Sequence, residues 1–192
     1  MITRLSSMIA DFFVANGENS NYEIICYGIE ITLSTILNIA IVIVCGIFSG
    51  MVFESILFFV TLASIRMFSG GFHADTYLKC NLILLLNTIV VLLFEKIVCC
   101  FSITVIRIIQ VFSIIFIFIV LFAVAPCENK NKPIDDIQRL ILRKRCLICT
   151  TIISIVSIFL SIAAYKFAVA VSLGMISVSI SMIADTITNR KG

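Results

Sequence analysis

The sequence predicts an all-α, polytopic membrane protein with six transmembrane helices and an N-terminal amphipathic helix in the membrane interface. Of the 192 residues, 61% are hydrophobic and only 13% are charged. Soluble domains carry about 25% charged residues, so this composition is typical of a membrane protein. The apolar residues also gather into six long runs, separated by short polar or glycine-containing segments. These two observations carry the assignment of the fold class.

Each apolar run is long enough to cross a bilayer as a helix, which takes about 20 residues with about 17–25 tolerated. The runs cover residues 29–48, 52–68, 78–94, 103–124, 146–164 and 168–187. The connections after the first and fifth runs are so short that they predict tight helical hairpins. Since no internal repeat or second domain is evident, we expect residues 1–192 to form one membrane-embedded domain.

Residues 1–22 predict an interfacial helix followed by a polar turn. Ile2, Leu5, Ile9 and Phe12 recur at helical spacing, and the polar residues fall on the other side. This pattern fits a helix lying in the membrane surface. A soluble amphipathic cap is the alternative.

The distribution of Lys and Arg predicts the orientation, because cytoplasmic loops carry an excess of these residues. Both termini and the polar segments 66–80 and 126–145 fall on one side of the six spans, and that side holds 11 of the 14 basic residues. The other side holds Lys96, Arg107 and Lys166. We therefore expect both termini and both segments to be cytoplasmic.

Net charge and cysteine content narrow the possible functions. A net charge of +3 is too small to argue for a nucleic-acid partner. Eight cysteines could form a disulfide framework in a small secreted protein, but residues 1–23 contain no secretory signal. Most of the cysteines lie in or beside apolar runs, so we expect them to be reduced and structural.

The segment 66–80, between the second and third spans, holds the residues best suited to chemistry. It contains His73, which is the single histidine, and Cys80. In one straight helix these residues would lie about 10.5 Å apart along the axis, which is too far for a hydrogen bond. Gly70 and Gly71 allow the second span to end before His73.

A break at the glycines would give His73 and Cys80 a different geometry. Asp75 or Thr76 can cap the third span, which puts His73 in the preceding loop and Cys80 in the first turns of the helix. A loop that folds back could bring the imidazole to the thiol. A cysteine at a helix N-terminus beside a basic group holds more of the nucleophilic thiolate. Coincidence of one Cys and one His is the alternative.

Metal and redox chemistry find little support in the sequence. A single histidine excludes a multi-histidine metal site. Cys146 and Cys149 form a lone CxxC at the start of the fifth span, without a second pair, and we interpret them as structural. We expect no metal and no cofactor.

Polar residues inside the spans are expensive in lipid and are therefore candidates for function. Glu54 lies close to the extracytoplasmic end of its span, where hydration would explain it. Glu30 lies on the same side as His73, so it could support the site or simply end the helix in solvent. Four amides are expected to form hydrogen bonds between helices: Asn38, Asn81, Asn87 and Gln110.

The segment 126–145 contains both prolines and a cluster of basic residues. Pro126 must end the fourth span, and Asp135 is a candidate cap for a short interfacial helix that leads into the fifth span. The basic residues could contact anionic lipid, or they could dock an acidic peptide segment. They are Lys130, Lys132, Arg139, Arg143, Lys144 and Arg145.

Two motifs together resemble the accessory gene regulator protein B (AgrB) family. The first is Gly-Gly-Phe-His-Ala at residues 70–74, with Arg66 before it and Cys80 after it. The second is Ala-Pro at 125–126, followed by Asn-Lys-Asn-Lys-Pro at 129–133. Length and six-span layout agree with that family, so the resemblance extends over essentially the whole chain.

The resemblance implies a membrane cysteine endopeptidase of bacterial quorum sensing, in the plasma membrane. Such proteins cleave an AgrD-type precursor peptide and cyclise it to a thiolactone or lactone autoinducing peptide. By this resemblance Cys80 is the nucleophile and His73 the general base. Arg66, Gly71 and Glu30 match family positions that support the site, with Asp75 a further candidate, and a homodimer is implied.

Two functions of other classes are alternatives to the peptidase. A transporter of peptides or small molecules would need broken helices or charged residues near the midplane, and the last three spans are almost uninterrupted. A non-catalytic membrane scaffold would give Cys80 no more reactivity than the other seven cysteines.

Overall fold

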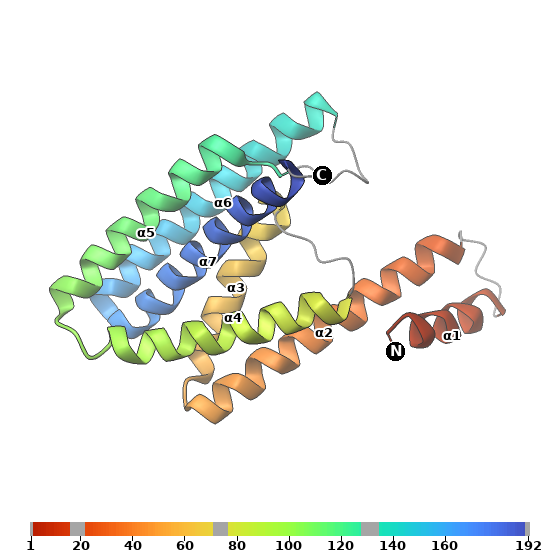
Figure 1. Ribbon diagram of the computed structural model, residues 1–192, viewed down its shortest axis with the longest axis horizontal. Helices are drawn as coiled ribbons and strands as arrows, with labels where there is room; N and C mark the ends of the chain where they lie inside the picture. The colour runs from red at the N-terminus through yellow and green to blue at the C-terminus, as the bar shows by residue number, and fades with distance from the viewer. Residues whose placement is uncertain (1, 16–21, 71–76, 128–134, 191–192) are drawn as a thin grey trace.

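The computed structural model of this protein describes residues 2–15, 22–70, 77–127 and 135–190. In these ranges it has seven α-helices and no strand (Figure 1). They are α1 (Ile2–Ala15), α2 (Tyr22–Ser49), α3 (Val52–Ser69), α4 (Tyr77–Val98), α5 (Ile103–Val124), α6 (Asp136–Ala163) and α7 (Tyr165–Arg190). Helices α2 to α7 are each long and apolar enough to cross a membrane. The predicted all-α, six-span architecture is confirmed.

The helices alternate in direction, which gathers their connections at two ends of the molecule (Figure 1). One end holds α1, the start of α2, the end of α3, the start of α4, the end of α5, the start of α6 and the end of α7. The other end holds the three short turns that join α2 to α3, α4 to α5 and α6 to α7. We call the first of these the polar end, because it carries the two longer polar connections.

Two helices extend beyond their predicted spans at the polar end. Helix α2 begins at Tyr22 rather than at residue 29, and α6 begins at Asp136 rather than at residue 146. The predicted interfacial helix after Asp135 is therefore continuous with the fifth span. Asp135 caps it, since its carboxylate accepts a hydrogen bond of 2.9 Å from the backbone N–H of Asp136. At 28 residues, α2 and α6 are each about 42 Å long and exceed the hydrocarbon thickness of about 30 Å.

Helix α7 is the centre of the molecule, and α3, α4, α5 and α6 all contact it. Its buried face is rich in small residues, among them Ala168, Ala170 and Ser172. A Cβ atom added at Gly174 would lie 2.9 Å from the Thr61 side chain, so α3 and α7 approach too closely for a larger residue. Small residues let helices pack closely in lipid, where the hydrophobic effect does not drive association.

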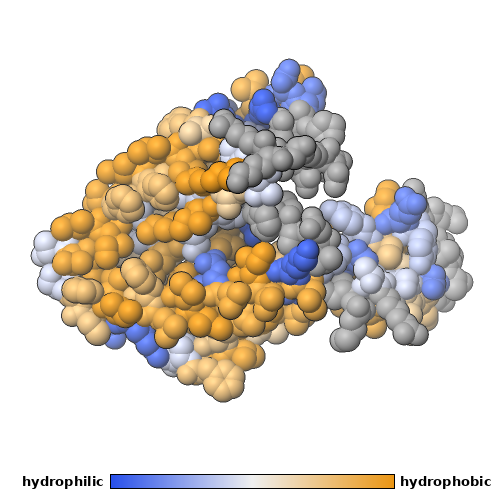
Figure 2. Space-filling model, viewed as in Figure 1, coloured by the Kyte–Doolittle hydropathy of each residue, from blue (hydrophilic) through white to orange (hydrophobic). Residues whose placement is uncertain are grey.

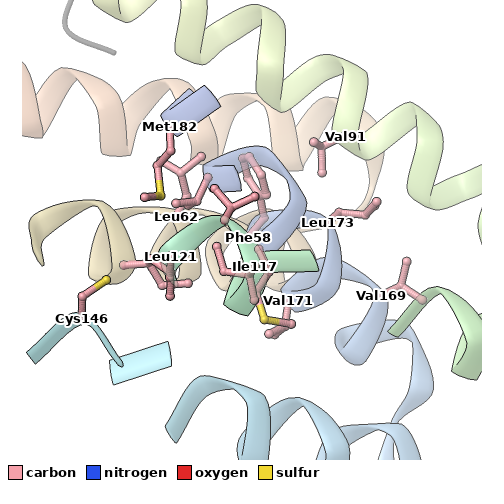
Figure 3. Packing of buried hydrophobic residues seen from close by; sticks show 14 of the residues in the cluster. Phe58, Leu62, Val91, Ile117, Leu121, Cys146, Val169, Val171, Leu173 and Met182 are labelled. Carbon is pink, nitrogen blue, oxygen red and sulfur yellow. The ribbon is translucent and has the colours of Figure 1, made fainter. Parts of the chain in front are cut away.

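Larger apolar side chains fill the space around α7 (Figure 3). Phe58, Ile117 and Met182 are completely buried, and Leu121 is nearly so. Most large apolar side chains instead point outward and make the middle of the molecule a hydrophobic surface (Figure 2). A lipid environment requires such an apolar outer surface.

Helix α1 packs on α2 through its small residues. Ser6 and Ala10 are buried in that contact, while Leu5, Met8 and Phe12 are exposed. The predicted N-terminal amphipathic helix is therefore present, and its exposed apolar side chains suit the predicted interfacial position.

Candidate functional site

The end of α3 and the start of α4 hold two of the predicted site residues, Arg66 and Cys80, at the polar end. Helix α3 ends at Ser69 and α4 begins at Tyr77, as the glycines and the spacing of His73 and Cys80 predict. Arg66 lies in the last turn of α3, and Cys80 lies in the first turn of α4. Gly71, His73 and Asp75, as well as Thr76, lie outside the described residues.

Gly70 ends α3 in a conformation that suits only glycine. Its φ is +71°, and a Cβ atom there would lie 2.9 Å from the backbone oxygen of Cys127. The backbone N–H of Cys127 donates a 2.9 Å hydrogen bond to the carbonyl of Ser69. The chain after α5 thus closes directly over the end of α3, and this explains why residue 70 has no side chain.

A pocket between α3, α4 and α7 contains both Arg66 and Cys80. Its volume is about 60 Å³. The nine lining residues are Leu62, Arg66, Cys80, Ile83, Leu84, Asn87, Ser177, Val178 and Ser181. We call it the Cys80 pocket. It puts the predicted nucleophile at a sheltered position that is still half-exposed.

Cys127 lies at the same end of the molecule, but its surroundings suit a thiol that stays protonated. Burial, and next the carboxylate of Asp185, raise the pKa of the Cys127 thiol to about 12. At neutral pH almost none of it is thiolate. Cys80, whose side chain lines a pocket together with Arg66, is therefore the better candidate nucleophile of the two.

Glu30 is joined by a hydrogen bond to α4, the helix that carries Cys80. Its carboxylate accepts a 3.0 Å hydrogen bond from the Tyr77 hydroxyl and a 3.2 Å hydrogen bond from the Ser6 hydroxyl. Three helices, α1, α2 and α4, therefore meet at one carboxylate. Sequence reasoning considered Glu30 but missed Tyr77, because nothing in the sequence pairs residues 47 positions apart.

The basic residues described at the start of α6 differ in their surroundings. Arg143 is half-buried, and its guanidinium donates a 3.0 Å hydrogen bond to the carbonyl of Phe122 in the last turn of α5. That carbonyl has no partner within its own helix, so Arg143 caps α5. Arg139, Lys144 and Arg145 are exposed.

The other two basic residues of the predicted docking set, Lys130 and Lys132, lie outside the described residues. The two cysteines of the CxxC sequence lie on α6. Cys146 is buried, and the thiol of Cys149 donates a hydrogen bond of 3.7 Å to the carbonyl of Ser64 on α3. In the described part of the chain, no three His, Cys, Asp or Glu side chains form a group that could hold a metal ion.

Three of the four amides predicted to join helices do so. Asn81 accepts from Ser34, Asn87 accepts from Ser177, and Gln110 donates to Ser157. For Asn38 the prediction is wrong, because its buried side-chain oxygen has no hydrogen-bond partner among the described residues.

Glu95 is a buried carboxylate that sequence reasoning missed. The third span was expected to end at Phe94, but α4 continues to Val98, and Glu95 is 0% exposed. Neither of its oxygens has a hydrogen-bond partner in the described ranges. Its spacing of seven residues from Thr88, a polar residue inside the third predicted span, is the signal that could have placed it on the same helix face. Glu95 is 15 residues from Cys80, about 22 Å along the helix, so it belongs to the other end of the molecule.

The comparisons with known proteins agree on one family. The family model described as accessory gene regulator B matches residues 6–183. Two curated relatives from Clostridium perfringens, provisionally named AgrB-like protein 2 (strain 13) and AgrB-like protein (strain SM101), are each 28% identical over 138 residues. The matched region covers 70% of this chain but 64%, less than two thirds, of each relative. No solved structure matches.

Proposed function

The chain belongs to the accessory gene regulator B (AgrB) family, and from this premise we propose that it is a membrane cysteine endopeptidase that processes an AgrD-type precursor peptide. The observation that carries the proposal is the Cys80 pocket. The half-exposed Cys80 at the start of α4 and Arg66 at the end of α3 both line this pocket. The single histidine of the chain, His73, lies in the sequence of that break.

In the proposed reaction the Cys80 thiolate attacks the peptide carbonyl carbon. A C–S bond forms as the C–N bond breaks, and His73 gives its proton to the departing amine. The product of this step is a thioester between Cys80 and the N-terminal part of the precursor. A Cys or Ser side chain inside the bound peptide then attacks the thioester, which releases a thiolactone or lactone ring and returns the Cys80 thiol.

Two features of α4 support this chemistry. Cys80 is in the first turn, where backbone N–H groups have no intrahelical partner and can donate to a developing oxyanion. The surrounding helices are apolar, and a site with little water protects the thioester from hydrolysis. Exchange of one thioester for another is nearly isoenergetic, so formation of a thiolactone needs no ATP.

The charge at the polar end suits an acidic peptide segment. Arg139, Lys144 and Arg145 are exposed on the first turns of α6, close in sequence to the basic residues Lys130 and Lys132. We propose that this surface docks the acidic part of the precursor or anionic lipid at the cytoplasmic face. Because Arg143 caps α5, it contributes less to docking than its neighbours. We also propose that the protein forms a homodimer in the plasma membrane.

The test is co-expression with the peptide of a short reading frame beside the gene that encodes an amphipathic helix, a central Cys or Ser and an acidic tail. Mass spectrometry follows loss of the tail. Cys80→Ala and His73→Ala should each abolish cleavage, whereas Cys100→Ala, which removes an exposed thiol at the opposite end, should leave it unchanged. Undiminished cleavage by either of the first two variants would contradict the proposal.

A further inference from the structure

We propose that the Cys80 pocket is the specificity subsite for the residue that acylates Cys80, and that it accepts an aliphatic side chain while excluding an aromatic one. This inference rests on the proposed function. It adds the chemical class of the peptide residue at the cleaved bond and the residues that select it.

The position of the pocket follows from helical spacing. On α4, Cys80, Leu84 and Asn87 are separated by four and three residues and share one face of the helix. Asn87 lies about 10.5 Å beyond Cys80 along the axis, toward the middle of the span. The pocket therefore extends inward from the thiol and does not lie beside it.

The two facing helices run in the same sense along this pocket. Arg66 on α3 and Ser181 on α7 lie nearest the polar end, and Leu62 and Ser177 lie one turn deeper on the same helices. The part of the pocket nearest the polar end thus holds the thiol and a guanidinium, and the part farther along the helices is lined by apolar side chains, Asn87 and Ser177.

Covalent geometry requires a side chain at this place. In a thioester the Cys80 sulfur is bonded to the carbonyl carbon of the acylating residue, and the Cα atom of that residue is the next atom. Its side chain must therefore begin within a few ångströms of the sulfur. The pocket is the space lined jointly by Cys80 and by apolar side chains, and Leu62, Leu84 and Val178 supply its walls.

Two of the lining residues are joined by a hydrogen bond. The hydroxyl of Ser177 donates to the side-chain oxygen of Asn87 at 3.3 Å, which joins α7 to α4. On α4, Asn87 is the lining residue farthest from Cys80. The bond therefore holds α4 against α7 at the part of the pocket that is most distant from the thiol.

Volume decides between aliphatic and aromatic occupants. The pocket measures about 60 Å³, whereas an engineered apolar cavity that binds benzene measures ~150 Å³. An aliphatic side chain of three or four carbons is therefore closer to the available volume than a phenyl ring of six carbons.

The experiment uses acetyl-Gly-Xaa chloromethyl ketones in which Xaa is Ala, Leu or Phe, with the full chain in native membranes. The Cys80 sulfur displaces chloride, so a C–S bond forms, a C–Cl bond breaks and the thiol proton passes to solvent. Peptide mapping by mass spectrometry gives the rate at Cys80. We expect the Leu reagent to react about 10-fold or more faster than the Phe reagent, the range that pocket size usually gives.

Two variants on different helices enlarge the pocket. Leu84→Ala on α4 and Val178→Ala on α7 should each shift the Leu-to-Phe rate ratio toward Phe, by about 10-fold for the larger deletion. Leu86→Ala is the matched control, because Leu86 is on the same helix but 56% exposed, against 8% for Leu84. Its ratio should equal that of the unsubstituted protein.

The outcomes separate the two proposals. If Cys80 reacts but the ratio stays the same in both Leu84→Ala and Val178→Ala, the pocket does not select the peptide, and the endopeptidase proposal stands without it. A pocket filled by a lipid acyl chain would give that result. If no reagent labels Cys80 faster than the other cysteines, the proposed nucleophile and the subsite are both overturned.

Discussion

Glu95 and Glu30 are two carboxylates in apolar helices with opposite surroundings. Glu30 accepts hydrogen bonds from Tyr77 and Ser6. Glu95 is fully buried, and both its oxygens are without a hydrogen-bond partner among the described residues. A buried polar group without a partner costs about 1–3 kcal/mol. Satisfied and unsatisfied carboxylates therefore make opposite contributions to stability.

Replacement of Glu95 by methionine, which fills similar space without polar oxygens, is expected to stabilise the protein. The gain should be about 1–3 kcal/mol, the desolvation cost that is removed. Thermal unfolding in detergent micelles measures it as a higher midpoint. Lys96→Met, at an exposed neighbour, is the control and should change little. A lower midpoint for Glu95→Met would mean that the carboxylate has a partner that stabilises it.

At the scale of elements, the start of α4 depends on a contact with α2. The hydroxyl of Tyr77 donates to Glu30 at 3.0 Å, three residues before Cys80. This bond fixes the first turn of α4, and with it the thiol, relative to α2. We interpret Tyr77 and Glu30 as positioning residues that do not touch the substrate.

Tyr77→Phe removes only the hydroxyl that makes this contact. We expect kcat for precursor cleavage to fall several-fold while KM changes little, because the thiol is less well held and the binding surface is retained. Glu30→Gln keeps an acceptor oxygen and should retain most of the activity, whereas Glu30→Ala should match Tyr77→Phe.

The controls for this prediction lie on the same helices. Tyr27→Phe removes an exposed hydroxyl on α2 and should have no effect. The double variant Tyr77→Phe/Glu30→Ala should be no worse than Glu30→Ala alone, since Glu30→Ala already removes the bond to Tyr77. Additive losses in the double variant would show that the two residues act independently.

At the scale of the whole molecule, the alternation of six spans separates two chemically different ends. The polar end holds Arg66, Lys79 and the basic start of α6, whereas the opposite end holds Lys96, Arg107 and Lys166. We predict that the polar end is cytoplasmic, because the excess of basic residues lies there.

Two native cysteines test this orientation. Cys100 is exposed at the opposite end, and Cys80 is half-exposed at the polar end. A sulfonated, membrane-impermeant maleimide should label Cys100 in intact cells and reach Cys80 only after permeabilisation. Cys100→Ala identifies the labelled site. Labelling of Cys80 but not Cys100 in intact cells would reverse the predicted topology.

Much of the fold could be predicted because a lipid environment requires each span to be a continuous run of apolar residues. Apolar runs of about 20 residues must become helices, since every backbone polar group needs a partner in the helix itself. The break before Cys80 was also predictable, because adjacent glycines in the sequence allow a helix to end. By contrast, the helical extension through Glu95 was missed because an acidic residue usually marks the end of a span.

The sequence by itself determined that six helices cross a membrane, that they alternate, and that Cys80 lies in the first turns of the third. Only the tertiary structure decided which helices meet. No local sequence pattern predicts the contact of Tyr77 with Glu30 or of Asn87 with Ser177. The small residues of α7 likewise do not predict which helices pack on them. In lipid, helix contacts depend on close fit and on a few hydrogen bonds rather than on burial of apolar surface. Apolar patterns therefore predict spans, while the Cys80 pocket arises only from the packing of three of them.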